Sequence, residues 1–186
     1  MGQMIQLSAA DGQQIPAYVA QPAGAAKGAV VVIQEIFGVN SHIRNVEALP
    51  APGVMQDIQA AIDYAAQTSG GKVGIVGYCW GGLLTWRSAC TLKGLSAAVP
   101  YYGGGVTTEA EIARHPQVPV LAHFADEDKW IALDTVAAFK KAHPEVQVFN
   151  YAAHHGFNCD QRGAWDAPSA ALARERSLAF FAKHLA

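Results

Sequence analysis

Five short apolar runs, separated by stretches of helical character, constrain the fold of this chain more than any other feature. Each run carries little charge and several are rich in β-branched residues, which is typical of strands buried on both faces of a parallel sheet. The runs cover residues 28–35, 72–77, 94–102, 118–124 and 146–152. Helices are expected at 41–50, 55–66, 80–92, 133–143 and 168–186. Strands that alternate with helices predict a doubly wound α/β fold, with a mostly parallel sheet, right-handed crossovers and helices on both faces.

The N-terminal residues follow a different pattern. Two short strands, 4–9 and 15–22, flank a polar turn at Asp11 and Gly12, which predicts an antiparallel pair. A chain of 186 residues that is 51% hydrophobic suits one domain with a sizeable core. We therefore expect a single α/β domain over residues 1–186.

The charge balance argues against several classes of partner. The 13 basic and 15 acidic residues give a formal net charge of −2 without any basic patch, so neither nucleic acid nor a membrane surface is expected as a partner. No apolar run approaches the ~18 residues of a membrane span, and the N-terminus lacks a signal-peptide pattern. The three scattered cysteines do not form a disulfide framework. We expect a cytoplasmic monomer or small homo-oligomer that acts on a small molecule.

The segment Gly77-Tyr78-Cys79-Trp80-Gly81 stands where a predicted strand ends and a helix begins. This context matches the nucleophile elbow, G-x-S-x-G, with cysteine in place of serine. The sharp turn holds the nucleophile in a strained conformation, and glycines two residues away on either side relieve the crowding. The helix start also directs N–H groups at the sulfur, which favours the thiolate. A buried cysteine beside a tight turn is the alternative interpretation.

A thiol nucleophile needs a base, and the base needs an orienting carboxylate. In hydrolases with this elbow, the chain order is nucleophile, acid, histidine. Acidic residues at 126–128 follow one predicted strand, and His154 and His155 follow the last one. Both segments lie beyond the carboxyl ends of strands, where α/β sheets bind ligands. The sequence thus predicts a constellation of Cys79, an acid near 128, and one of the two histidines.

Four motifs resemble the dienelactone hydrolase family, from about Gly28 to the C-terminus. They are QEIFGVN (34–40), GYCWGG (77–82), DEDKWI (126–131) and HHGFN (154–158). The resemblance implies an α/β-hydrolase with a Cys-His-Asp triad that hydrolyses dienelactones or related esters without a metal. Matched by position, it implies Cys79 as nucleophile, Asp128 as orienting acid and His155 as base. Asp126, Glu127 and His154 are then expected to form a solvated loop rim.

The resemblance assigns further residues. Glu35 closes a buried strand, where a carboxylate needs a partner. The resemblance implies that Glu35 faces the resting cysteine and helps to deprotonate it; a salt-bridged loop anchor is the alternative. The backbone N–H groups of Ile36 and Trp80 are expected to form the oxyanion hole. Phe37 and Trp130 are expected to line an apolar pocket.

The chain departs from the family pattern in two places. Between the helices at 41–50 and 55–66, family members have a further strand and a long loop, but only four residues connect the helices here. Because losing a parallel strand leaves backbone groups unpaired, we expect residues to be missing near 49–54, with the numbering closed over the gap. A truly shortened hydrolase is the alternative. The family also has a carboxylate-binding arginine four residues after the histidine, where this chain has Cys159; Arg162 cannot be assumed to replace it.

Three hypotheses of function follow. The leading one is hydrolysis of a small ester or lactone through a covalent thioester on Cys79, without cofactor or metal. Its rivals are a thiol redox protein, although no C-x-x-C motif is present, and a non-catalytic α/β-hydrolase-like binding module. Cys90 is expected to be an inert core thiol. His154, His155 and Cys159 could ligate a metal, but no fourth ligand has the characteristic spacing.

Overall fold

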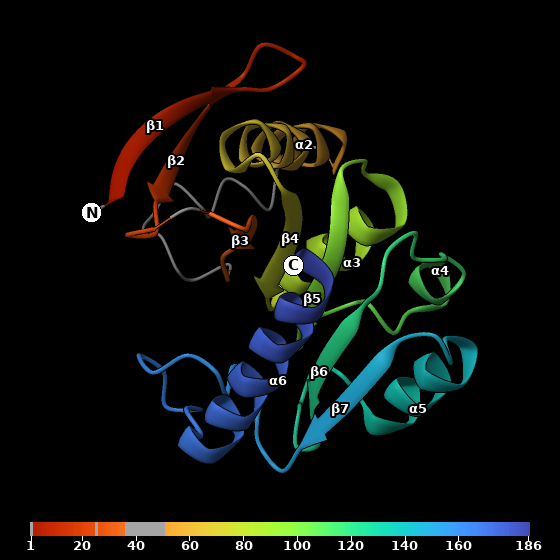
Figure 1. Cartoon of the computed structure of the whole chain (residues 1–186). Coiled ribbons are helices and arrows are strands. Elements are labelled where there is room, and N and C mark those ends of the chain that lie inside the picture. The colour runs from red at the N-terminus through yellow and green to blue at the C-terminus, as the bar shows by residue number, and fades with distance from the viewer. Residues whose placement is uncertain (1, 25, 36–50) are drawn as a thin grey trace.

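The computed structural model describes residues 2–24, 26–35 and 51–186, which contain two separate sheets (Figure 1). The first is an antiparallel hairpin of β1 (Gly2–Ser8) and β2 (Gln14–Ala20). Gly12 lies in its turn with φ of 88°, a left-handed conformation that glycine adopts without steric cost. The predicted N-terminal antiparallel strands are confirmed.

The second sheet has five parallel strands in sequential order, β3-β4-β5-β6-β7. They are β3 (Gly28–Ile33), β4 (Lys72–Tyr78), β5 (Leu95–Tyr101), β6 (Leu121–Ala125) and β7 (Gln147–Tyr151). Each strand overlaps one of the five apolar runs. Because all five strands run the same way, their carboxyl ends meet at one edge of the sheet. Cys79, Asp128 and His155 follow strand ends at that edge.

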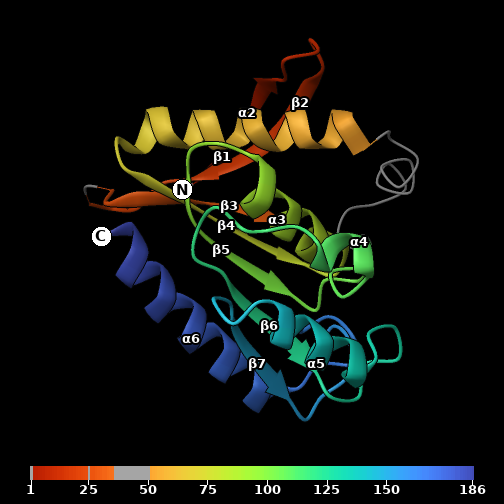
Figure 2. The ribbon, with the colours of Figure 1, turned by 90° about the vertical axis from the view of Figure 1, so that its right-hand side faces the viewer.

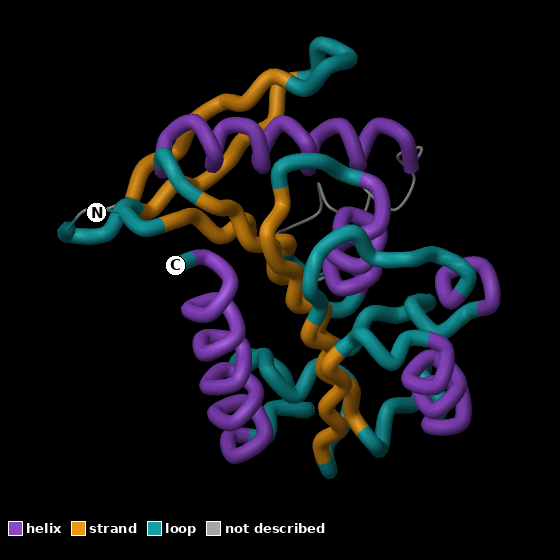
Figure 3. Tube along the Cα trace, turned by 45° about the vertical axis from the view of Figure 1, so that its right-hand side comes forward, coloured by secondary structure: helices purple, strands orange, loops and turns teal. Residues whose placement is uncertain are grey.

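The helices cover both faces of the parallel sheet. They are α2 (Ala51–Ser69), α3 (Trp80–Thr91), α4 (Glu109–Ile112), α5 (Leu133–Ala142) and α6 (Ala167–Leu185). Sequential strand order with right-handed crossovers puts the connecting helices on one face. Figure 3 shows α3 and α5 on one side of the sheet and the closing helix α6 on the other. Helix α2 packs on β3 and β4 and also contacts β1 of the hairpin (Figure 2). The predicted α/β fold class is confirmed.

A buried polar network joins α6 to the sheet. His123 of β6 is fully buried, with Nδ1 2.8 Å from the Tyr151 hydroxyl and Nε2 2.9 Å from the hydroxyl of Ser177 on α6. The Tyr101 hydroxyl lies 2.7 Å from the same serine oxygen. Burial lowers the pKa of His123 to about 3, so its ring is neutral at physiological pH. The network satisfies polar groups that would otherwise destabilise the core.

Strand β3 differs from its prediction. The run at 28–35 was expected to be buried on both faces, but Val30 and Val32 are exposed on one face. Val31 and Ile33, on the other face, pack against the core. The prediction was wrong because α6 packs mainly over β4, β5 and β6, so the apolar composition of β3 does not reveal which neighbour covers it.

Helix α2 begins at Ala51, four residues before the predicted start, so residues 51–54 belong to the helix rather than to a connection. A proline in the first turn is compatible with this, since its missing N–H has no partner in the helix there. The predicted helix at 41–50 and positions 49 and 50 lie outside the described residues. The expected break near 49–54 therefore stays a prediction.

The unequal cover of the sheet can be tested with two isosteric substitutions. Val99→Thr in β5 places a hydroxyl at a site with 0% exposure and should lower the free energy of unfolding by about 1–3 kcal/mol. Val32→Thr in β3, at a site 63% exposed, should change it by less than about 0.5 kcal/mol. Urea denaturation measures both. Equal losses in the two variants would contradict this description of the core.

Candidate active site

Cys79 stands at the N-cap of α3 with φ of 56° and ψ of −119°. A positive φ is strained for a residue with a β-carbon, and among the described non-glycine residues only Tyr102 shares it. Hydrogen bonds hold this turn in place. The Cys79 N–H donates to the Tyr101 carbonyl at 3.1 Å, and the Cys79 carbonyl accepts from the Gly82 N–H at 2.9 Å. The backbone geometry is that of a strand-to-helix elbow.

The two glycines of the motif make this turn sterically feasible. A β-carbon at Gly77 would collide with the Gly81 carbonyl and the Thr85 hydroxyl. A β-carbon at Gly81 would lie 2.6 Å from the carbonyl oxygen of Gln34 and 2.7 Å from that of Ile33. These obstacles are mostly backbone atoms, which cannot move aside cheaply. The glycines therefore let α3 pack directly against the end of β3.

His155 lies between Asp128 and Cys79. Its Nδ1 is 2.7 Å from Asp128 Oδ2, and its Nε2 is 3.1 Å from Cys79 Sγ. Because a carboxylate only accepts, Nδ1 carries the proton and donates it. The Asp128 side chain is fully buried, and its other oxygen accepts the N–H groups of Trp130 at 2.9 Å and Ile131 at 3.2 Å. The three residues follow the carboxyl ends of β4, β6 and β7.

The neighbouring candidates lie on the surface. Asp126 accepts a hydrogen bond from the Asn150 side chain at 2.8 Å. His154 is exposed, and its Nε2 is 3.3 Å from a Glu127 carboxylate oxygen. The structure thus brings Asp128 and His155, rather than Asp126 and His154, to the cysteine.

The surroundings of His155 favour its charged form. Burial of the ring opposes a positive charge, but the hydrogen bonds to Asp128 and Cys79, together with the nearby Asp128 carboxylate, outweigh it. They raise the pKa of His155 to about 9. The ring is therefore an imidazolium at neutral pH, within reach of both the carboxylate and the sulfur.

Glu35 is buried just beyond β3 and has two partners. Its Oε1 accepts the Tyr102 hydroxyl at 2.7 Å, and its Oε2 accepts Arg162 Nη1–H at 2.9 Å. Burial and the charge of Glu35 raise the pKa of Tyr102, which keeps this hydroxyl protonated and able to donate. In this geometry Glu35 is a salt-bridged anchor, which is hydrogen-bonded to Tyr102 and Arg162.

Sequence reasoning missed Tyr102 and left Arg162 aside. One local signal for the arginine was present in Gly156, directly after His155. Gly156 has φ of 82°, and a β-carbon there would lie 2.8 Å from Arg162 Nη1. The glycine thus lets the guanidinium pack against the loop that carries the histidine.

A hollow of about 320 Å³ lies beside His155. Its lining includes Trp130, Arg162 and His154. Trp130 is exposed, and its ring stands edge-on to His155 with centroids 4.9 Å apart. Trp80 is the first residue of α3, where an N–H has no carbonyl partner within the helix. Ile36, expected in the oxyanion hole, and Phe37, expected in the apolar pocket, lie outside the described residues.

The other cysteines lie in different surroundings. Cys90 is buried on α3, and burial raises the pKa of its thiol to about 12, so it stays protonated. Cys159 is half-buried. In the part of the chain that the structure describes, no helix is long and apolar enough to cross a membrane.

The parallel sheet and its helices define the chain as an α/β-hydrolase. The model of the dienelactone hydrolase family matches residues 15–53 and 46–185. This chain therefore belongs to the dienelactone hydrolase family, as the four motifs indicated, and is a carboxylic ester hydrolase.

Individual relatives agree with this assignment. The carboxymethylenebutenolidase of Pseudomonas putida is 32% identical, with 96% of this chain and 95% of that enzyme aligned. The crystal structure of a candidate dienelactone hydrolase from Klebsiella pneumoniae superposes with a TM-score of 0.81 at 26% identity, covering 98% of this chain and 99% of that one. A dienelactone hydrolase-like promiscuous phosphotriesterase from metagenomic libraries has a TM-score of 0.79 at 19% identity, over 98% of each chain, and supports the fold alone.

The alignments also bear on the shortened connection. The alignment with the Pseudomonas putida enzyme spans 228 positions, although this chain has 186 residues. The family model matches in two pieces that overlap at residues 46–53. Relatives thus contain residues that this sequence lacks, and the boundary of the two matches falls where the motifs placed the gap.

The pairing of His155 with Asp128 can be measured directly. We predict that nuclear magnetic resonance gives a His155 pKa of about 9 in the wild type and a lower value in Asp128→Asn, which loses the negative charge. Since folding raises this pKa above about 6.5, the stabilisation is complete below that pH and is lost as the pH rises through about 9. Asp126→Asn is the matched control and should leave the His155 pKa unchanged. The reverse pattern would assign the acid to Asp126.

Proposed function

We propose that this hydrolase cleaves a small ester or lactone through Cys79, with His155 as the proton carrier and Asp128 as the orienting acid. One observation carries the proposal, namely the His155 ring between the Asp128 carboxylate at 2.7 Å and the Cys79 sulfur at 3.1 Å. Nucleophilic catalysis requires a base within hydrogen-bonding reach of the nucleophile and a third group that orients the base.

In the first half-reaction, the Cys79 thiolate attacks the substrate carbonyl carbon and forms a carbon–sulfur bond. The tetrahedral intermediate collapses with cleavage of the carbon–oxygen bond, and the leaving oxygen takes the proton from His155 Nε2. Asp128 holds the ring through Nδ1 and stabilises the imidazolium before the transfer. The products of this half-reaction are an alcohol, or the opened end of a lactone, and a thioester on Cys79.

In the second half-reaction, the neutral His155 removes a proton from water as the water oxygen attacks the thioester carbonyl. The carbon–sulfur bond then breaks, which releases the carboxylic acid and restores the thiolate beside the imidazolium. The Trp80 N–H, with that of Ile36, is proposed to bind the developing oxyanion in both half-reactions. Sulfur leaves more readily than an amide nitrogen, so esters and lactones suit this site better than peptides.

In this proposal, Glu35 can act as a base only after it loses one of its hydrogen-bond partners. The carboxylate is held by Tyr102 and Arg162, and so it must exchange a partner before it can accept a proton from Cys79. A substrate group that binds the Arg162 guanidinium would weaken that ion pair and release the carboxylate. We propose that Glu35 takes the proton of the resting thiol in this way and returns it to the Cys79 thiolate once the acid product leaves. Between turnovers the carboxylate then anchors the loop through Tyr102 and Arg162.

The relatives narrow the substrate class. A related enzyme is a carboxymethylenebutenolidase, whose name denotes a lactone bearing a carboxylate. Arg162 lines the hollow beside His155 and offers a guanidinium for such a group, although it occupies a different sequence position from the family's arginine. A substrate screen should therefore compare neutral esters and lactones with their carboxylate-bearing counterparts.

The role of Cys79 can be tested against Cys90, a buried cysteine on α3. With p-nitrophenyl acetate, Cys79→Ala should lose at least about 10³-fold in kcat/KM, because the nucleophile is gone. Cys90→Ala should keep most of the activity, since that thiol is protonated and lies in the core. Circular dichroism checks that both variants fold.

The same assay separates the rival functions. If the protein were a thiol redox protein, Cys79→Ala would leave the rate of ester hydrolysis unchanged. A binding module would show no hydrolysis in the wild type. Equal losses in the two folded variants would remove Cys79 from the role of nucleophile.

A further inference from the structure

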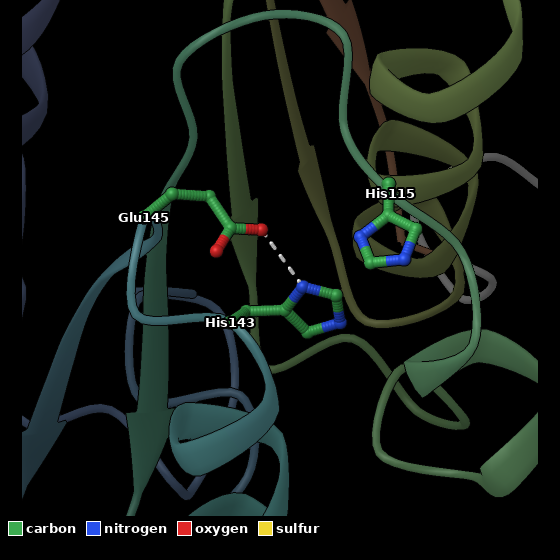
Figure 4. A group of neighbouring side chains, drawn as sticks. All are labelled: His115, His143 and Glu145. Carbon is green, nitrogen blue, oxygen red and sulfur yellow. Dashed lines mark hydrogen bonds and ion pairs between the residues drawn. The ribbon is translucent and has the colours of Figure 1, made fainter.

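A second cluster of potential metal ligands lies at the end of the parallel strands opposite to the candidate active site. His115 precedes β6, while His143 and Glu145 lie between α5 and β7 (Figure 4). These residues stand before the amino ends of β6 and β7, whereas Asp128 and His155 follow the carboxyl ends of the same strands. Among the described residues, this is the one group of three potential metal ligands whose ligand atoms all lie within 4.8 Å of one another.

His143 is already oriented as a metal ligand would be. Its ring is fully buried and packs edge-on against Trp86, with centroids 5.1 Å apart. It also packs against the tilted ring of Phe139, with centroids 4.9 Å apart. Its Nε2 lies 2.9 Å from the Ile112 carbonyl, which can only accept, so Nε2 carries a proton. A metal-bound histidine usually donates its second ring N–H to a carbonyl or carboxylate in this way.

That hydrogen bond leaves Nδ1 as the nitrogen that faces the cluster. Nδ1 lies 2.9 Å from Glu145 Oε1, and the His115 ring stands across from it with centroids 5.7 Å apart. Figure 4 shows the two rings and the carboxylate converging from two separate connections. Either Nδ1 also carries a proton and donates to Glu145, or its lone pair is free for a cation.

We propose that His115, His143 and Glu145 bind a divalent transition-metal ion of the Zn²⁺ class. Two imidazoles and one carboxylate are ligands that Zn²⁺ accepts at about 2.0–2.2 Å, with water completing the tetrahedron. His115 is exposed and Glu145 is half-exposed, so these two can close on the ion while the buried His143 stays fixed. Arg114, next to His115, is paired with Glu111 at 3.0 Å, which offsets its repulsion of a cation.

The bound ion would cross-link the loop before β6, which carries His115, to the loop before β7, which carries His143 and Glu145. Because the site lies at the opposite ends of these strands from Cys79, the ion takes no part in ester hydrolysis. Its effect is on stability, since a ligand that binds only the folded chain raises the free energy of unfolding by mass action.

The test must exclude binding by thiolates, which are strong zinc ligands themselves. The full chain with Cys79→Ser and Cys159→Ser serves as the background, freed of metal and titrated with Zn²⁺ by calorimetry. We expect one ion per chain and a higher Tm in its presence. His115→Ala and Glu145→Gln, both at accessible positions, should each weaken binding at least tenfold, about the minimum loss that even outer-shell partners of a metal cause. Each should also abolish the Tm shift.

His184→Ala and Glu175→Gln are matched controls remote from the cluster in sequence and should bind like the background. Replacement by Co²⁺ adds a spectroscopic readout, because nitrogen and oxygen ligands give d–d bands without thiolate charge transfer. Absence of stoichiometric binding in the background would overturn the proposal. Unchanged affinity in both His115→Ala and Glu145→Gln would overturn it equally.

Discussion

The parallel alignment of β4, β6 and β7 is the constraint on which the candidate site depends. It places three strand ends at one edge, so residues up to 76 positions apart meet within hydrogen-bonding distance. The elbow at Cys79 adds a strained backbone, which costs about 1–3 kcal/mol and persists only where the surroundings fix it. The bond to the Tyr101 carbonyl and the glycine contacts between α3 and β3 supply that restraint. The sheet thus sets both the meeting point and the orientation of the sulfur.

Charge in this region is buried in pairs rather than singly. Asp128 is held by two backbone N–H groups and by His155, whose raised pKa follows from that contact. Glu35 is held in a similar way by Tyr102 and Arg162. A buried charge without a partner is costly, so loss of one member destabilises the other. The two pairs therefore keep the site polar and hold the side chains around the Cys79 sulfur in place.

Much of this architecture could be predicted from local patterns. Apolar runs located each parallel strand that the structure describes, and the glycines around Cys79 located the elbow. The choice of His155 over His154 depended on the family resemblance, because adjacent residues share the same local signal. Tyr102 was missed and Arg162 was left aside, because their contacts with Glu35 arise only from the tertiary fold. For the same reason, the exposure of Val32 could not be predicted, since composition does not tell which face of β3 a helix covers.

In the proposed reaction Cys79 carries the acyl group during hydrolysis. The most direct measurement is peptide mapping by mass spectrometry after acid quenching of the enzyme in its first turnover of p-nitrophenyl acetate. We expect an acetyl group on the peptide that contains Cys79, bound as a thioester and removed by hydroxylamine. Turnover without an acetylated chain, or with the acetyl group on another residue, would contradict it.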